Sequence, residues 1–321
     1  MVLDDFEAIR EVSPEWDHLH HQVGRGRQRT AGVLAQTPWM QLTAISRTPG
    51  ARIQGAPPRG TTVLAASLRG ARVQVQGEGW GREALGFLRG QGEFEMVAPE
   101  PHAELVLAIA SERLDAVAVE RFGEPLLPPR GSSLLRLRGR GALRRIVATS
   151  ARWLRTVSAH PDLLLDPAVA GRMESEVLAA FLDGVDREPR PAPARPRRDL
   201  ARRAESFLRD SIQSAVRLQD VCDAVGASSR AVHAAFHDVY GIPPKAYWKA
   251  LRLSAARADL VRARPGTTVS EVAARWGFFQ FGYFSVDYRR MFGEQPRETL
   301  ARGLGARVSN VLVRPGARPI A

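Results

Sequence analysis

The chain has 321 residues and a formal net charge of +12, a length that predicts two domains and a charge that favours a polyanionic partner. Its single cysteine, Cys222, excludes an internal disulfide framework and suits a reducing cytoplasm, where we expect the protein to act. No apolar run approaches about 18 residues, and no basic segment precedes an apolar one at the N-terminus, so the sequence predicts neither a membrane span nor secretion.

Residues 1–186 are predicted to form a β-rich domain that ends in helices, which makes the whole chain α+β. The apolar residues between Trp39 and about Arg138 form short runs separated by glycines, at 40–45, 63–68, 73–75, 94–97, 105–109 and 134–137. Many short strands at such spacing are typical of an antiparallel sandwich or a small barrel. Two amphipathic helices are predicted to follow, at 142–158 and 167–186.

The predicted barrel has the composition of a ligand pocket. Its large apolar residues are Trp39, Trp80, Phe87 and Met96, although these are equally compatible with an ordinary core. An arginine such as Arg47 or Arg69 is suited to orienting a carboxylate. We therefore expect a small apolar effector, uncharged or acidic, and a homodimer formed by the two helices, whose apolar stripes exceed what one small barrel buries.

The histidines do not indicate a metal centre. A metal-dependent cupin needs clustered histidines and glutamates inside the barrel, but His102 is the only histidine between Trp39 and Arg138. His18, His20 and His21 are interpreted as a polar surface segment. We expect no metal, no cofactor and no catalytic residue, so a metal-dependent cupin-type enzyme tethered to DNA is the alternative rather than the main interpretation.

Two segments lack an apolar face. Residues 187–198 are rich in proline and arginine, a composition typical of an extended, semi-rigid linker. Residues 303–321 are expected to form a flexible tail. Between them, residues 199–302 are predicted to form an all-α domain.

This C-terminal domain contains an internal repeat. The matched positions, 51 residues apart before a turn and 52 after it, are Asp220 with Glu271, Val221 with Val272, Cys222 with Ala273, Gly226 with Gly277, Val232 with Phe284, Phe236 with Tyr288, Tyr240 with Phe292, and Gly241 with Gly293. Each copy consists of a short helix, a glycine turn and a second helix with an apolar stripe. The pattern is that of a helix-turn-helix unit.

Local signals fix the boundaries of these units. Thr268 and Glu271 form a predicted capping box, which starts a helix at 269–276, and Ser228 is expected to cap the second helix of the first copy. The stretch 247–263 has neither proline nor glycine and is predicted to be one continuous helix between the copies. It would hold the two units about one turn of DNA apart, roughly 34 Å.

Residues 199–302 resemble the DNA-binding domain of the AraC/XylS family of bacterial transcription regulators. The resemblance rests on GIPPKAYWKALRLSAARADL at 241–260 and VSEVAARWGFFQFGYFSVDYRRMFGEQP at 269–296. It implies a sequence-specific DNA-binding regulator, an activator that works with RNA polymerase. It further implies a cupin-like sensor and a helical dimerisation segment in the N-terminal region.

The second helix of such a unit enters the major groove, so polar side chains near its start meet the bases. For the first unit we expect contacts from Ser229, Arg230, His233 and His237, with Arg230 either bidentate to guanine or on a phosphate. Family members commonly carry arginine at the positions of Ala234 and Val286. Neither residue is an arginine in this chain, so other side chains must contact the bases in their place. For the second unit the expected contacts are Gln280, Phe281, Gly282, Tyr283, Ser285 and Arg289. A nonspecific architectural DNA-binding protein remains the other alternative.

Overall fold

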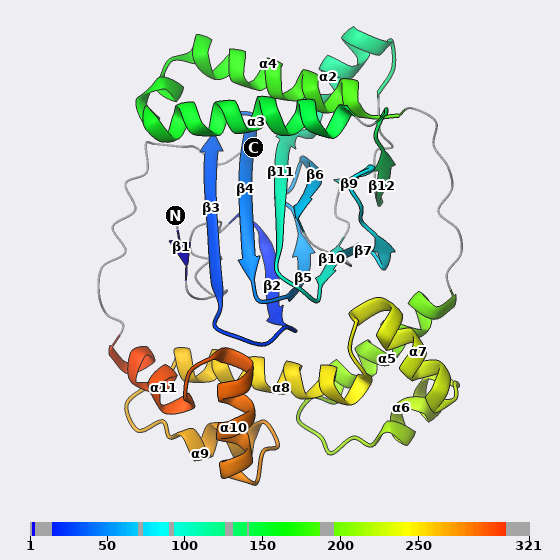
Figure 1. Cartoon of the computed structure of the whole chain (residues 1–321), viewed down its shortest axis with the longest axis vertical. Coiled ribbons are helices and arrows are strands. Elements are labelled where there is room, and N and C mark those ends of the chain that lie inside the picture. The colour runs from blue at the N-terminus through cyan, green and yellow to red at the C-terminus, as the bar shows by residue number, and fades with distance from the viewer. Residues whose placement is uncertain are drawn as a thin grey trace.

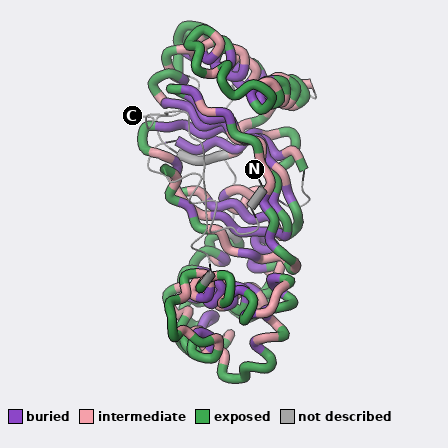
Figure 2. Tube along the Cα trace, turned by 90° about the vertical axis from the view of Figure 1, so that its left-hand side faces the viewer, coloured by how far each residue is buried: buried purple, intermediate pink, exposed green. Residues whose placement is uncertain are grey.

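The computed structural model describes residues 2–3, 15–69, 73–89, 93–125, 131–139, 141–186 and 196–305. Along the longest axis of the molecule, a layer of helices lies at one end, two sheets in the middle and an all-helical domain at the other end (Figure 1). Buried residues run along the strands and on the inner sides of the helices, as Figure 2 shows. The predicted α+β fold is therefore confirmed.

The β-rich region consists of two antiparallel sheets. Their orders are β1-β3-β4-β11-β6-β9-β12 and β2-β5-β10-β7-β8, so the strands form two separate sheets and the barrel is not closed. The bounds are Val2–Leu3 for β1, Asp17–Gln22 for β2, Arg29–Gln36 for β3, Met40–Thr48 for β4, Ala51–Ala56 for β5, Thr61–Arg69 for β6, Gln74–Val75 for β7, Glu78–Gly79 for β8, Ala84–Arg89 for β9, Phe94–Ala98 for β10, His102–Ala110 for β11 and Gly131–Arg136 for β12.

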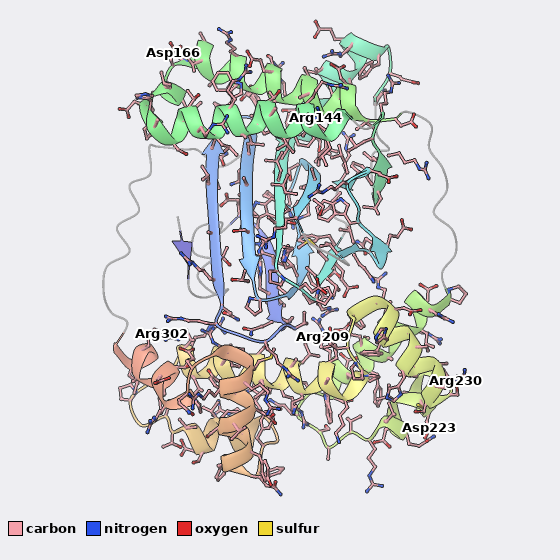
Figure 3. All side chains as sticks on the ribbon, viewed as in Figure 1. Arg144, Asp166, Arg209, Asp223, Arg230 and Arg302 are labelled. Atoms are coloured by element: carbon pink, nitrogen blue, oxygen red, sulfur yellow. The ribbon has the colours of Figure 1, made fainter. Side chains whose placement is uncertain are left out.

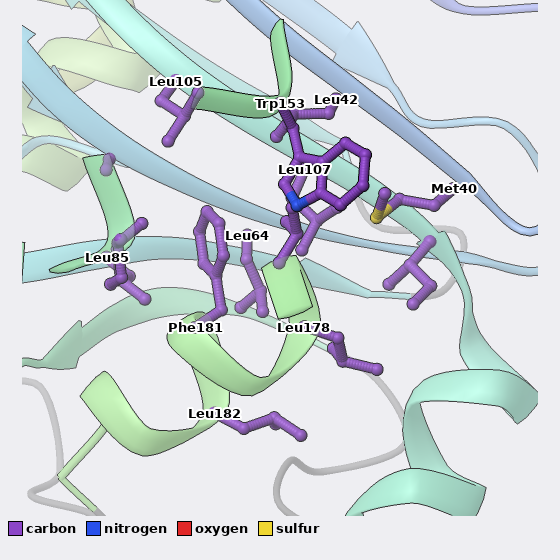
Figure 4. Close-up of a cluster of buried hydrophobic side chains, with 14 of the residues drawn as sticks. Met40, Leu42, Leu64, Leu85, Leu105, Leu107, Trp153, Leu178, Phe181 and Leu182 are labelled. Carbon is purple, nitrogen blue, oxygen red and sulfur yellow. The ribbon is translucent and has the colours of Figure 1, made fainter. Parts of the chain in front are cut away.

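Helices cover the seven-stranded sheet. They are α2 (Ser111–Phe122), α3 (Ala142–Ala159), the short 3₁₀ helix η1 (Pro161–Leu165) and α4 (Pro167–Gly184). Trp153 of α3 and Phe181 of α4 lie among leucines of the sheet such as Leu107 (Figure 4). Within the described residues, no helix combines the length and the apolar character needed to cross a membrane.

The apolar stripes of α3 and α4 are buried within a single chain. Ile146, Trp153, Met173, Val177 and Phe181 are all nine-tenths or more buried against the sheet and against each other. The expectation that these stripes exceed what the β-rich region can cover was wrong, because the seven-stranded sheet offers a wide apolar face. The structure thus removes the argument on which the predicted dimer rested.

The C-terminal domain contains seven helices within the described residues. Their bounds are Pro196–Asp210 for α5, Leu218–Val225 for α6, Ser229–Tyr240 for α7, Pro244–Val261 for α8, Val269–Arg275 for α9, Phe281–Phe292 for α10 and Pro296–Gly305 for α11. Helix α5 begins inside the predicted linker at 187–198, and residues 187–195 lie outside the described residues. Helix α11 includes 303–305 of the predicted tail, and residues 306–321 lie outside the described part as well.

Helix α8 joins two separate cores. Tyr247 and Leu251 contribute to the core of α5, α6 and α7, whereas Leu253 and Leu260 contribute to the core of α9, α10 and α11. In Figure 1, α8 runs across the helical domain just below the sheets, from one unit to the other. The predicted continuous connector is confirmed, and it starts at Pro244, the first-turn position that proline favours.

The five-stranded sheet separates a cavity from the helical domain. Successive residues of a strand point to opposite faces, so Ile53 of β5 lines the cavity while Arg52 pairs with Glu205 of α5. The same alternation places Met96 of β10 at the cavity and Val97 in the core of the first helix-turn-helix unit. One sheet therefore contacts both compartments.

Candidate nucleic-acid interface

The first unit has the predicted turn and cap. Gly226 adopts a left-handed φ of 62°, and the Ser228 hydroxyl accepts a hydrogen bond from the Ala231 N–H at 3.3 Å. This cap starts α7 at Ser229. Because Val232, Phe236 and Tyr240 fill the core from one face of α7, the opposite face is left to solvent.

The predicted contacts of the first unit lie on that open face. Ser229, Arg230, His233 and His237 are all exposed, and Arg230 stands at the outer edge of the domain (Figure 3). His233 Nδ1 donates to the Ser229 carbonyl at 2.9 Å, since a carbonyl only accepts. This bond fixes the ring beside the start of α7. The other ring nitrogen, Nε2, lies on the opposite edge of the exposed imidazole.

The second unit repeats this geometry. The Thr268 hydroxyl accepts from the Glu271 N–H at 3.2 Å while Glu271 accepts from the Thr268 N–H at 3.1 Å, which confirms the predicted capping box. Gly277 supplies the turn with a φ of 76°. Gln280 then stands at the N-cap of α10.

The predicted contacts of the second unit divide into two groups. Gln280, Phe281, Gly282 and Tyr283 are exposed around the start of α10, and Arg289 is exposed in its last turn. Ser285 is half-buried, and its hydroxyl donates to the Phe281 carbonyl at 3.0 Å, so its donor is already used within the helix. Two exposed side chains in this region, Phe279 and Val286, were absent from the predicted set.

Both second helices contact the β-rich region through their C-terminal ends. The Asp238 carbonyl of α7 accepts from Gln74 of β7, and the Met291 carbonyl of α10 accepts from Gln22 of β2. A backbone bond of 3.0 Å from the Gly26 N–H to the same Met291 carbonyl reinforces the second contact. The N-terminal ends of α7 and α10, which carry most of the predicted base contacts, therefore point away from the sheets.

A cavity of about 140 Å³ lies between the two sheets. As predicted, Trp80, Phe87, Met96 and Arg47 line it, and Arg47 forms an ion pair with Glu104, which also lines the cavity. Two predicted residues do not line it: the side chain of Trp39 is 45% exposed at the surface, and Arg69 is exposed at the end of β6.

The histidines near the N-terminus are not a surface segment. His18 and His20 lie on one face of β2 and line the cavity, while His21 faces the opposite side of the strand. The i, i+2 spacing of His18 and His20 in a strand was the signal that could have revealed this. Within the described residues, no group of three or more histidine, cysteine, aspartate or glutamate side chains is arranged to hold a metal ion.

Burial keeps the histidines beside the cavity neutral. Burial, opposed by Glu104 and reinforced by Arg47, lowers the pKa of His102 from 6.5 to about 4. Burial also lowers the pKa of His20, and the positive charge of Arg47 adds to that effect. Because the imidazole of His20 lines the cavity without a charge, this part of the wall suits an uncharged ligand.

We expect the β-rich domain to lose stability as the pH falls from 6.5 towards 4. Above pH 6.5, His102 is neutral in the folded and unfolded chains alike; below it, the unfolded chain binds a proton that the folded chain does not. Each pH unit in this window removes at most about 1.4 kcal/mol for this histidine. Urea unfolding at pH 7.5, 6.5, 5.5 and 4.5 measures the slope. His102→Phe should flatten it, and an equal slope in both proteins would contradict the assignment.

Comparisons with known proteins point to the C-terminal domain. Residues 221–302 match a family model described as a helix-turn-helix domain. Over 144 residues the chain is 33% identical to the probable thc operon regulatory protein of Rhodococcus erythropolis, covering 43% of each protein. Over 101 residues it is 32% identical to XylDLEGF operon transcriptional activator 3 of Pseudomonas putida, covering 31% of this chain and 30% of that protein. The chain thus spans less than half the length of these two curated relatives.

A solved structure matches about a third of the chain. It is the crystal structure of a probable AraC family transcriptional regulator from Rhodopseudomonas palustris CGA009, with 34% sequence identity and a TM-score of 0.32. The match covers 33% of this chain and 98% of that chain.

Proposed function

We propose that the chain is a transcription regulator of the AraC/XylS family, a sequence-specific activator that reads two adjacent major grooves of DNA; the helix-turn-helix match at 221–302 and the identity to operon regulators support this. The observation that carries this proposal is the pair of helix-turn-helix units on one helix, each with the start of its second helix exposed. The family is one of regulators and not of enzymes, and we assign the chain no catalytic residue.

Selection of bound genomic fragments with the purified chain tests the proposal. A regulator of this kind enriches a two-part motif, because its units differ in sequence and need not read a palindrome. Salt titrations on an enriched fragment and on a scrambled copy then separate specific from nonspecific binding. Equal affinity for both sequences at every salt concentration would favour an architectural protein and contradict the proposal.

Arg230→Ala should relax base preference at one position of the site, with a loss of about 1–3 kcal/mol of discrimination there. The reason is the exposed position of Arg230 in the first turn of α7. Arg289→Ala is the matched control, because this exposed arginine lies in the last turn of α10. It should weaken all sequences alike and reduce the salt slope by about one. Uniform weakening by Arg230→Ala would reassign that side chain to a phosphate.

We also propose that the protein acts in the cytoplasm with RNA polymerase and responds to a small apolar effector in the cavity between the sheets. Trp80, Phe87 and Met96 supply apolar walls, and Arg47 with Glu104 forms a polar end. Thermal-shift screening against aromatic acids, amines and sugars tests this, since a ligand raises the midpoint in proportion to ln(1 + [L]/Kd). A homodimer through residues 1–186 stays a prediction, to be tested by sedimentation.

A further inference from the structure

The second unit presents an apolar surface where the first unit is polar. Four large side chains around the start of α10 are strongly exposed: Phe279 by 77%, Tyr283 by 72%, Val286 by 57% and Phe281 by 44%. We call these four residues the apolar reading face. The corresponding stretch of α7 carries Ser229, Arg230 and His233 instead.

The core of the unit does not account for this face. Phe284, Tyr288 and Phe292 already fill the core from the other side of α10, with adjacent ring centroids 5.5 Å and 4.6 Å apart. Tyr283 and Val286 are three residues apart and so adjoin each other on the outer surface of the helix. A group of exposed apolar side chains is typical of an interaction site.

The charges around this face favour a polyanion. Arg289 and Arg290 are exposed one turn further along α10. Arg275 at the end of α9 is also exposed, and it pairs with Asp259 at 2.9 Å. The one carboxylate of α10, Asp287, is half-buried and pairs with Lys249 at 3.0 Å. Apolar side chains next to arginines fit the floor of a major groove between its two phosphate backbones.

From this surface we infer that the second unit recognises thymine through its C5 methyl group; the inference rests on the proposed DNA-binding function. Phenylalanine and valine side chains cannot read donors or acceptors, and the thymine methyl is the apolar group that base edges present in the major groove. Gly282 has no side chain, and the space beside it is open, since a Cβ there would meet nothing within 4 Å. A base can therefore come close to the backbone of α10 at this position. The two units thus differ in chemistry: the first offers polar side chains at the start of its second helix, and the second adds contacts to thymine methyl groups.

Replacing thymine by deoxyuridine isolates this contact, because it removes the methyl group and keeps the hydrogen-bonding edge. Each thymine of the enriched site is replaced singly, and affinity is measured by fluorescence anisotropy with the full chain. We expect about a fourfold loss for each contacted methyl, the value for burying one such group. Thymines whose replacement has no effect serve as internal controls.

The variants Val286→Ser and Phe281→Ser identify the side chains involved. Both positions are exposed, so the fold should be kept, which circular dichroism checks. Each variant should bind more weakly and lose the discrimination between thymine and uracil at its own position, while Arg230→Ala keeps it. Specific binding that is indifferent to every uracil replacement overturns the inference and leaves the proposed function intact. Failure to enrich any sequence contradicts the proposed function itself, and the inference with it.

Discussion

Replacing Arg52 by methionine is expected to lower the free energy of unfolding by about 3–5 kcal/mol and to release the helical domain from the sheets. Arg52 is 0% exposed, and its Nε donates to Glu95 Oε1 at 2.6 Å. Its guanidinium also lies 2.9 Å from Glu205 of α5. Without the arginine, Glu95 is buried without the cation that it pairs with, and Glu205 keeps the half-buried Arg209 as its ion-pair partner.

Two rings of the first unit complete this contact. The guanidinium carbon of Arg52 lies 5.8 Å from the ring centres of both Tyr240 and Tyr247. Urea unfolding measures the loss, and hydrogen exchange of β5, α5 and α7 locates it. Arg209→Met is the control, since Arg209 is only half-buried beside Glu205; we expect it to cost under about 1 kcal/mol. A similar small loss for Arg52→Met would show that the domains are held together elsewhere.

Phe284→Ala should unfold the second helix-turn-helix unit while the first unit stays folded. Phe284 is buried in the core of α9, α10 and α11, and removing such a ring costs about 3–5 kcal/mol. Within the described residues, the buried core clusters of the two units share no residue, and α8 contributes side chains to both. The loss should therefore remain local.

Hydrogen exchange followed by mass spectrometry distinguishes the two units. Phe284→Ala should remove protection from α9 and α10 and leave α6 and α7 protected. Phe236→Ala, the matching change in the first unit, should do the opposite. Equal loss of protection in both units after either change would mean that α8 couples them into one cooperative domain.

The helical domain was predictable because its signals are local. Thr268 with Glu271 and Ser228 with Ala231 lie within one turn of each other, so spacing alone identifies where α9 and α7 begin. Glycines at positive φ mark the turns in the same way. Helix α2 was missed because it follows β11 directly at Ser111, with no glycine or proline to mark the change.

Within the five-stranded sheet, the runs at 73–75 and 94–97 predicted β7 and β10, whereas β2 and β5 were missed for a physical reason. β2 lines the cavity with His18 and His20, and β5 carries the ion-paired Arg52 beside Ile53, so neither strand shows a run of apolar residues. The exposed residues of the candidate interface were also only partly predictable from the sequence. Phe279 and Val286 have apolar side chains, and only tertiary packing determines that they face solvent rather than the core.

The alternating strands of the five-stranded sheet also constrain how such a protein can evolve. His20 and Ile53 face the cavity, while their chain neighbours His21 and Arg52 face the helical domain. Point substitutions at one set of positions can change what the cavity admits without altering the other set. An inserted or deleted residue would exchange the two sets at once. Descendants of this protein should therefore diverge in ligand preference by substitution in β2, β5 and β10, with the lengths of these strands held constant.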